Sequence, residues 1–443
     1  MNSTLIFKRY GLAVPHILLP RPGIDLSRWA VIACDQFTQD REYWKNAAQF
    51  AGSAPSTLNL ILPEVYLEDA DRAERLAAIR NTMQEYRSGG AVFREPIHGF
   101  MYIERKTAWG RIRKGLVAAI DLDAYDWKPD SKALIRATEA TIVDRIPPRM
   151  EIRRGAPLEL PHIMLLVNDP DKTLIEALGS RIRNHAPVYE TPLEPDAGSI
   201  RGWSITHPDD LEAASAAIQS LAEAGTADDG SCFLFAVGDG NHSLATAKAV
   251  WEEFRSAHQE DVKKGLIDLE NHPARFALVE LVNLYDDGLT FEPIHRVLFG
   301  TSADAVGTQL AQTLGGKTVQ TESAAHLEQL VAEENQTRFG FVSTAGLHIL
   351  DTPDPALAVS RLQPALDAFL ASRPDVKIDY IHGTDEVFRL GKLADTVSIL
   401  LPPVKKDSFF TTIATGGPLP RKSFSMGEAS EKRYYLECRA LFD

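Results

Sequence analysis

A short loop between two apolar segments carries the residues of this sequence that are best suited to chemistry. Residues 232–237 read as a buried strand and residues 244–257 have helical periodicity, with Gly238-Asp239-Gly240-Asn241-His242-Ser243 between them. Glycines permit a tight turn and the close approach of a ligand. The first N–H groups of a helix have no intrahelical partner and lie at the positive end of the helix dipole. We therefore expect a phosphate site formed by Gly238, Gly240, Asn241, His242 and Ser243.

Asp239 is the acidic member of this loop. A carboxylate beside a phosphate site either holds a divalent cation that bridges the phosphates or orients an attacking hydroxyl. The alternative interpretation is that Asp239 and Asn241 are ordinary cap and turn residues. The local residues leave both interpretations open.

Two familiar phosphate-binding motifs do not fit this chain. The P-loop pattern needs a glycine five residues before Gly316, and that position is Ala311. The dinucleotide pattern G-x-G-x-x-G begins at Gly238 and Gly240, but its third glycine is replaced by Ser243. We therefore exclude a P-loop and regard a dinucleotide fold as disfavoured.

Four ordered segments of the chain resemble the bacterial and archaeal DUF family numbered one thousand and fifteen. The run VGDGNHSLATAK is similar to the D-G-H-H-R…A box of that family. The family segment H-E-x-T…D-R is resembled by Thr138-Glu139-Ala140-Thr141 followed by Asp144-Arg145. The family segment P-x-H-R is matched by Pro293-Ile294-His295-Arg296, and the segment P-x-K-S by Pro420-Arg421-Lys422-Ser423.

The resemblance implies a relation to the ParB and sulfiredoxin superfamily, which includes free-serine kinases. Glu139 then resembles the catalytic carboxylate that accepts the substrate proton, Asp239 the acid of the glycine box, and His242 the imidazole that touches a nucleotide phosphate. Arg145, His295 and Arg296 join the nucleotide site on the same resemblance. The cofactor it implies is ATP or ADP with Mg²⁺. Superfamily members share the pocket but not the reaction.

The sequence departs from the family pattern inside both boxes. Thr138 replaces the histidine of H-E, Asn241 replaces the first histidine of D-G-H-H-R, and Ser243 replaces its arginine. Losing the arginine removes a bidentate, charge-assisted phosphate contact. Either another cation compensates or nucleotide binding is weaker. The candidate cations in the matching segments are Arg145, Arg149, Arg296 and Lys422.

Several other polar residues are candidates for structural or ligand-binding roles. His162 opens an apolar strand, where we expect a capping or core role, and His382 ends a strand-like run where it would line a pocket. Asp35 and Gln36 follow a buried strand at a strand-to-helix turn, a favoured place for ligand contacts. No H-x-x-x-H or H-x-H pair occurs, so a histidine-rich zinc site is disfavoured and any metal ligands stay unknown.

Composition places the chain among folded proteins and narrows its partners. The 443 residues are 44% hydrophobic and 24% charged, enough to bury several cores. A net charge of −14 disfavours attachment to nucleic acid or to an anionic membrane surface. Apolar runs fall short of the roughly 20 residues that span a bilayer, and the N-terminal stretch lacks the core of a secretory signal. We expect a cytoplasmic protein, and the three widely spaced cysteines as buried thiols.

Periodicity predicts an α/β protein of the α+β type with mixed sheets, in which additional N- and C-terminal α/β lobes flank a ParB/sulfiredoxin-like core. The expected lobes are residues 1–125, 126–300, which contain the glycine box, and 301–443. The expected helices cover residues 40–50, 69–88, 171–184, 207–224 and 244–257. The expected strands cover residues 29–33, 99–105, 111–121, 162–167, 200–206, 232–237, 275–285 and 289–298, and residues 395–443 read as strand-like.

The leading functional hypothesis is a kinase-type, nucleotide-dependent phosphotransferase acting on a small hydroxylated metabolite, with free serine as the first candidate. One alternative is a ParB-like nucleotide-binding regulator without rapid turnover. Another is a structural or binding module whose altered D-G-N-H-S box has lost its nucleotide. The expected partners are a nucleotide and a small molecule, and a homodimer stays open.

Overall fold

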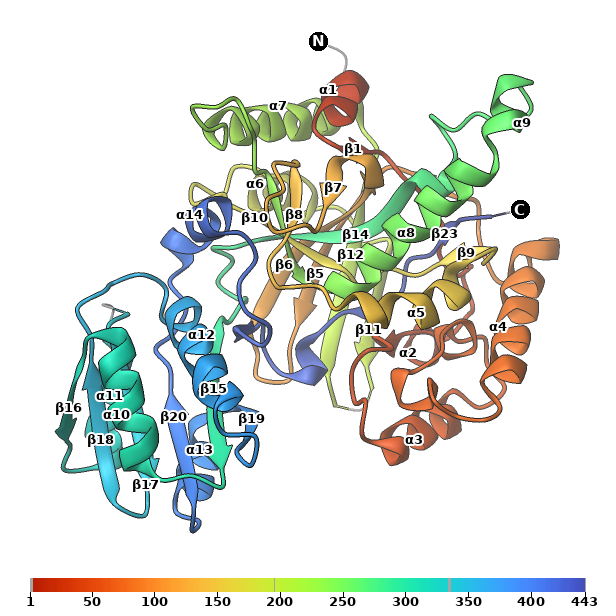
Figure 1. Cartoon of the computed structure of the whole chain (residues 1–443). Coiled ribbons are helices and arrows are strands. Elements are labelled where there is room, and N and C mark those ends of the chain that lie inside the picture. The colour runs from red at the N-terminus through yellow and green to blue at the C-terminus, as the bar shows by residue number, and fades with distance from the viewer. Residues whose placement is uncertain (1–2, 195, 334–335, 443) are drawn as a thin grey trace. The chain divides into compact units, whose positions relative to one another are not determined.

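The computed structural model in Figure 1 describes residues 3–194, 196–333 and 336–442. Two compact units make up the chain: Met1–Leu289 together with Glu428–Asp443, and Thr290–Gly427. The first unit is therefore discontinuous, because the chain leaves it for the second unit and then returns. Among the described helices, none is both long enough and apolar enough to cross a membrane.

The first unit is built on a large mixed sheet (Figure 1). Its strands lie in the order β11 (Tyr189–Leu193), β12 (Gly198–Ile205), β5 (Phe100–Lys106), β6 (Ile112–Asp121), β14 (Phe276–Asn283), β10 (Met164–Val167), β13 (Phe235–Asp239), β8 (Ile135–Ala137) and β7 (Tyr125–Asp126), with β1 (Leu12–Ala13) also on β6. The parallel pairs are β10 with β14, β13 with β8, and β7 with β8. The central strands are buried and rich in branched apolar residues, as expected for a sheet covered on both faces.

Helices and short strand pairs complete the first unit. The helices are α1 (Ser3–Arg9), α2 (Leu26–Trp29), α3 (Arg41–Ala51), α4 (Arg72–Arg87), α5 (Ile146–Arg153), α6 (Ile175–Ile182), α7 (Pro208–Ala224), α8 (Asn241–Ala257) and α9 (Gln259–Lys263). The short pairs are β2 (His16–Ile17) with β4 (Ile97–His98), β3 (Val31–Ile32) with β22 (Tyr434–Tyr435), and β9 (Leu158–Glu159) with β23 (Arg439–Ala440). The last two pairs join the C-terminal segment to elements near the start and middle of the chain.

A buried charge network holds this C-terminal segment in place. The Glu280 carboxylate on β14 accepts hydrogen bonds from Arg433 at 2.8 Å and from Arg113 at 3.4 Å, and Arg433 also pairs with Glu437. All four side chains are buried. A charge that loses its partner in such a setting destabilises the fold strongly. The network therefore fixes the position of the residues on either side of Arg433.

The second unit contains a separate antiparallel sheet. Its strands lie in the order β16 (Lys317–Gln320), β18 (Gly346–Asp351), β17 (Arg338–Ser343), β20 (Thr396–Leu400), β15 (Glu292–Phe299) and β19 (Lys377–His382), with β21 (Phe424–Ser425) also on β15. The helices are α10 (Ala303–Leu314), α11 (Ala324–Ala332), α12 (Ala358–Ala371), α13 (Thr384–Gly391) and α14 (Lys406–Gly416).

The predicted fold class is confirmed, because both units combine helices with sheets and the larger sheet is mixed. The predicted strands at 99–105 and 111–121 are present as β5 and β6, which pair antiparallel, and the predicted helices at 40–50 and 207–224 are present as α3 and α7. The strand-like interpretation of 395–443 was wrong in part, because α14 lies inside it. In α14, Phe409 and Ile413 are buried four residues apart, so the helical burial pattern overrides the β-propensity of its threonines.

The lobes expected from the sequence differ from the two compact units. Strands β5 and β6 come from 1–125, and β14 and β13 come from 126–300, yet all four belong to one sheet. The pairing of β6 with β14 alone joins Phe276–Val282 to Gly115–Asp121 in continuous register. Shared sheet hydrogen bonds make these two ranges one compact unit, and the second unit begins at Thr290.

Candidate functional site

The glycine loop lies between strand β13 and helix α8 of the first unit, and α8 is labelled in Figure 1. Strand β13 ends at Asp239, and Gly240 follows as the N-cap residue of α8 with a φ of 82°. L-residues with a side chain rarely adopt that conformation. A Cβ on Gly240 would also lie 3.0 Å from Cγ1 of Ile163. Backbone conformation therefore favours glycine where the strand turns into the helix, and a side chain there would need Ile163 to shift by a few tenths of an ångström.

Glu139 and Asp239 lie at the same edge of the large sheet. Strand β8 runs parallel to β13 with Ala137 opposite Val237, and the Thr138 hydroxyl donates to the Val237 carbonyl. Glu139 follows β8, as Asp239 ends β13, and its side chain is half-buried. The carboxyl ends of neighbouring parallel strands are where open α/β sheets place their ligands.

The first turn of α8 presents several polar groups that have no hydrogen-bond partner among the described residues. The amides of Asn241, His242 and Ser243 belong to the first turn, which leaves them without intrahelical acceptors. Within the described residues, Oδ1 of Asn241 and Oγ1 of Thr141 are buried and make no hydrogen bond. Buried polar atoms usually have a partner. Donors and acceptors for a polar ligand are thus both available at this helix end.

His242 is held as a neutral ring. Its Nε2 accepts the backbone N–H of Ile142 at 3.2 Å, so the single ring proton belongs on Nδ1. Burial lowers the pKa of His242 to about 4, and the nearby positive charges of Arg145 and Arg149 act in the same direction. At neutral pH the imidazole therefore offers an N–H donor without a positive charge.

The two arginines beside His242 differ in their own contacts. Arg149, on α5, donates from Nε to the Glu64 carboxylate at 2.9 Å and from Nη1 to the Arg145 carbonyl at 2.8 Å. Arg145 is exposed, and its guanidinium has no hydrogen-bond or ion-pair partner in the described part of the chain. Pro147 and Pro148 fall in the first turn of α5, where proline is favoured, so this segment begins a helix.

A lysine that sequence reasoning missed lies against the loop. Nζ of Lys432 is 3.3 Å from Oδ2 of Asp239, while Oδ1 of Asp239 accepts the N–H of Gly240 at 3.0 Å. Lys432 precedes the buried Arg433, so the charge network described above holds it in position. Its distance in the chain from the loop explains why no motif marked it.

A second group of side chains joins Ser243 to the C-terminal segment. Oγ of Ser243 lies 2.7 Å from Nε2 of His162, and Nδ1 of His162 lies 2.8 Å from the Tyr435 hydroxyl. That hydroxyl contacts Sγ of Cys34 at 3.2 Å, and Oδ2 of Asp35 is 3.7 Å from Nε2 of His162. His162 lies beside the loop with a largely buried side chain, and both of its ring nitrogens have protein partners. Asp35 lies there too, at the turn marked by the sequence.

His295 and Arg296 belong to the second compact unit, on strand β15. The Arg296 guanidinium is fully buried, donates to Oε1 of Gln363 at 2.8 Å and stacks over the Tyr380 ring. Nδ1 of His295 accepts the N–H of Leu401 at 3.1 Å, and burial lowers the pKa of His295 to about 4. These contacts lie within the second unit, and the nucleotide role expected for both residues stays a prediction.

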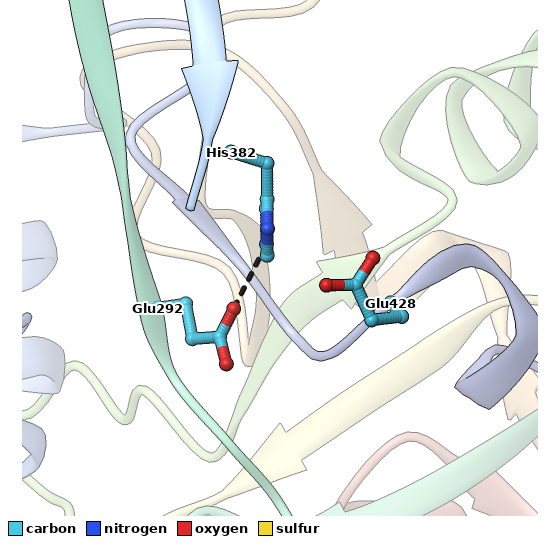
Figure 2. A group of neighbouring side chains, drawn as sticks. All are labelled: Glu292, His382 and Glu428. Carbon is cyan, nitrogen blue, oxygen red and sulfur yellow. Dashed lines mark ion pairs between the residues drawn. The ribbon is translucent and has the colours of Figure 1, made fainter. Parts of the chain in front are cut away.

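Two further candidate residues, His382 and Lys422, also belong to the second unit. Nε2 of His382 forms an ion pair with Oε2 of Glu292 at 3.0 Å, as Figure 2 shows. Lys422, the remaining candidate cation, is an exposed residue of this unit with a φ of 59°.

Several solved structures have a weak similarity to this chain. Among solved structures, a conserved hypothetical protein from Pyrococcus furiosus is 11% identical with a TM-score of 0.34, and covers 70% of this chain and 90% of its own. A free serine kinase variant in complex with ADP is 9% identical with a TM-score of 0.38, and the match covers 72% of this chain and 90% of the kinase chain. SbnI with a C-terminal truncation, from Staphylococcus aureus, is 9% identical with a TM-score of 0.36, and the match covers 70% of this chain and 83% of the SbnI chain.

The sequence comparisons give a clearer result. The search of curated proteins found no match. The family described as "Protein of unknown function (DUF1015)" matches residues 18–369, which is most of the chain and includes the glycine loop. The chain therefore belongs to the DUF1015 family.

Proposed function

We propose that this protein is a nucleotide-dependent phosphotransferase that acts on a small hydroxylated metabolite, with free serine as the first candidate acceptor. The observation that carries the proposal is the start of α8, where unpaired amides lie beside the unpartnered Oδ1 of Asn241. Amide donors suit phosphate oxygens, and a buried acceptor needs a donor such as a hydroxyl. A nucleotide carries both kinds of group on one molecule.

The charges around the loop support an anionic ligand. Lys432 lies against Asp239, and the exposed Arg145 lies beside His242. In this proposal the two cations take over the role of the family arginine that Ser243 replaces. The neutral His242 adds a donor that binds phosphate without the cost of burying another charge.

Glu139 is the proposed proton acceptor for the substrate hydroxyl. Phosphoryl transfer needs in-line positioning, neutralised phosphate charge and a carboxylate near the attacking oxygen. The parallel pair β8 and β13 brings Glu139 and Asp239 to one sheet edge, which is the arrangement this chemistry requires. We propose that Mg²⁺ accompanies the nucleotide at Asp239, and that the loop is used as in the ParB and sulfiredoxin superfamily.

Binding and turnover can be tested separately. Calorimetry with ATP, ADP and AMP, with and without Mg²⁺, is expected to show nucleotide binding to the wild type. Incubation with each nucleotide and a panel of hydroxy amino acids is expected to give a phosphorylated acceptor by mass spectrometry. Glu139→Gln should bind nucleotide like the wild type but form product at least about 100-fold more slowly. Glu190→Gln, an exposed glutamate on β11, is the matched control and should change neither quantity.

Three outcomes separate the hypotheses. Product that depends on Glu139 supports the phosphotransferase. Nucleotide binding that changes the oligomer size but yields no product with any acceptor favours a ParB-like regulator. Absence of binding for every nucleotide overturns the proposal and leaves a binding module that does not use nucleotide.

A further inference from the structure

Ser243 and His162 form a hydrogen-bonded pair of the kind that activates a nucleophile. Ser243 lies in the first turn of α8 and His162 lies just before strand β10. Their Oγ and Nε2 atoms are 2.7 Å apart, which is within the range for direct proton transfer. Ser243 is half-buried as a residue, and the contact with His162 holds its hydroxyl in place.

The Tyr435 hydroxyl lies against the second ring nitrogen of His162. Its oxygen accepts the backbone N–H of Cys34 at 3.1 Å and lies 3.2 Å from Sγ of Cys34 and 2.8 Å from Nδ1 of His162. With the ring proton of His162 on Nδ1, the ring donates to the tyrosine oxygen and Nε2 faces the Ser243 hydroxyl as an acceptor, which is the tautomer that the proposal uses.

An acidic side chain also lies close to His162. The Asp35 carboxylate is 3.7 Å from Nε2, a distance at which it would attract an imidazolium formed when Ser243 loses its proton. Cys34 does not compete as the nucleophile, because burial holds the pKa of its thiol well above the usual value.

We infer that Ser243 is a covalent nucleophile toward phosphoryl groups, with His162 as its general base and Tyr435 as the positioning residue for that base. In the reaction, Oγ of Ser243 forms a bond to phosphorus, and the bond from phosphorus to the leaving group breaks with its electron pair. The proton of Ser243 moves to Nε2 of His162. The choice of a phosphoryl electrophile rests on the proposed function, whereas the serine–histidine pair stands on its own contacts.

A nucleotide-free probe tests the nucleophile directly. Diisopropyl fluorophosphate reacts with an activated serine by forming an O–P bond and releasing fluoride. We expect intact-mass spectrometry of the full chain to show a single adduct and peptide mapping to place it on Ser243. Ser243→Ala should lose the adduct. Ser180→Ala, which removes an exposed helical serine hydroxyl, should keep it.

Substitution of the base distinguishes activation from mere exposure. His162→Gln should slow labelling by about 100-fold or more, within the usual range for loss of a general base. Tyr435→Phe should reduce the labelling rate by less than His162→Gln does, because it removes the positioning group and leaves the base in place. A thermal unfolding midpoint like that of the wild type confirms that each variant is folded.

The failure of this inference is distinguishable from failure of the proposed function. Absence of labelling in the folded wild type, or labelling that His162→Gln leaves unchanged, overturns the nucleophile. Nucleotide-dependent transfer to a metabolite without any phosphoserine at position 243 also overturns it and leaves the phosphotransferase standing. Labelling of Ser243 in a protein that binds no nucleotide supports the nucleophile and removes the phosphotransferase.

Discussion

Asp239 binds two partners at once, with Oδ1 accepting the N–H of Gly240 at 3.0 Å and Oδ2 lying 3.3 Å from Nζ of Lys432. The glycine loop and the C-terminal segment are therefore linked through one carboxylate. Because Lys432 is mostly buried, with an 11% exposed side chain, its charge acts on the loop with little screening by solvent.

Replacing this lysine should weaken nucleotide binding. For Lys432→Met we expect the Kd of the best-binding nucleotide to rise about 10- to 100-fold, as for loss of a hydrogen bond to a charged group. Lys132→Met, which breaks the exposed ion pair with Asp229, is the matched control and should leave the Kd unchanged. Calorimetry measures both, and equal affinities for the two variants would remove Lys432 from the site.

Gly240→Ala should destabilise the first unit by two separable effects. The positive φ costs about 1–2 kcal/mol for a residue with a Cβ, and the added Cβ meets Ile163. Gly230→Ala isolates the first effect, because Gly230 has a φ of 80° and no atom lies within 4 Å of the position that its new Cβ would occupy. Urea unfolding should therefore show a larger loss of unfolding free energy for Gly240→Ala than for Gly230→Ala. Equal losses would mean that Ile163 moves aside without an energetic penalty.

Acid should destabilise the fold partly through His242. Its pKa is lowered to about 4 in the folded chain, so between pH 6.5 and 4 the unfolded chain binds a proton that the folded chain does not. Stability due to this group is present above pH 6.5 and is lost as the pH falls toward 4. The free energy of unfolding of His242→Gln should fall less steeply over this interval. His185→Gln, which changes an exposed ring, should keep the wild-type slope.

Arg145 and Arg149 should separate binding from stability. Arg145→Met is expected to raise the nucleotide Kd while leaving the unfolding free energy unchanged, because the exposed guanidinium has no partner among the described residues. Arg149→Met should lower the unfolding free energy by about 1–3 kcal/mol, because it leaves the Glu64 carboxylate without its donor. Calorimetry measures the nucleotide Kd of each variant, and urea titration measures its unfolding free energy. If Arg145→Met lowers only the stability and Arg149→Met weakens only the binding, the two arginines have the opposite roles.

The sequence could predict the parts of the site that are adjacent in the chain. The apolar run, two glycines and helical periodicity around Asp239 predicted the strand, loop and helix that the structure contains. Glu139 was marked only through the family resemblance, and its place next to β13 follows from the parallel pairing of β8. Its catalytic role stays a prediction, as do the ligand roles of the loop residues.

The partners from distant segments could not be predicted in the same way. Lys432 and Tyr435 reach the loop through the pairing of β22 with β3 and through the buried contact of Arg433 with Glu280. These interactions join residues that are far apart in the chain, so no short sequence motif predicts them. His162 carried a weak signal, a polar residue at the start of an apolar strand, but its contact with Ser243 depends on how β10 lies beside β13.

The return of the C-terminal segment to the first unit also affects how the protein is made. Lys432 and Tyr435 leave the ribosome only after the whole of Thr290–Gly427 has been synthesised. Until then, the nascent first unit has its glycine loop and His162 but neither of the C-terminal side chains that contact them. Translation that stops early therefore yields chains without the complete site, and only chains that reach these last residues acquire it.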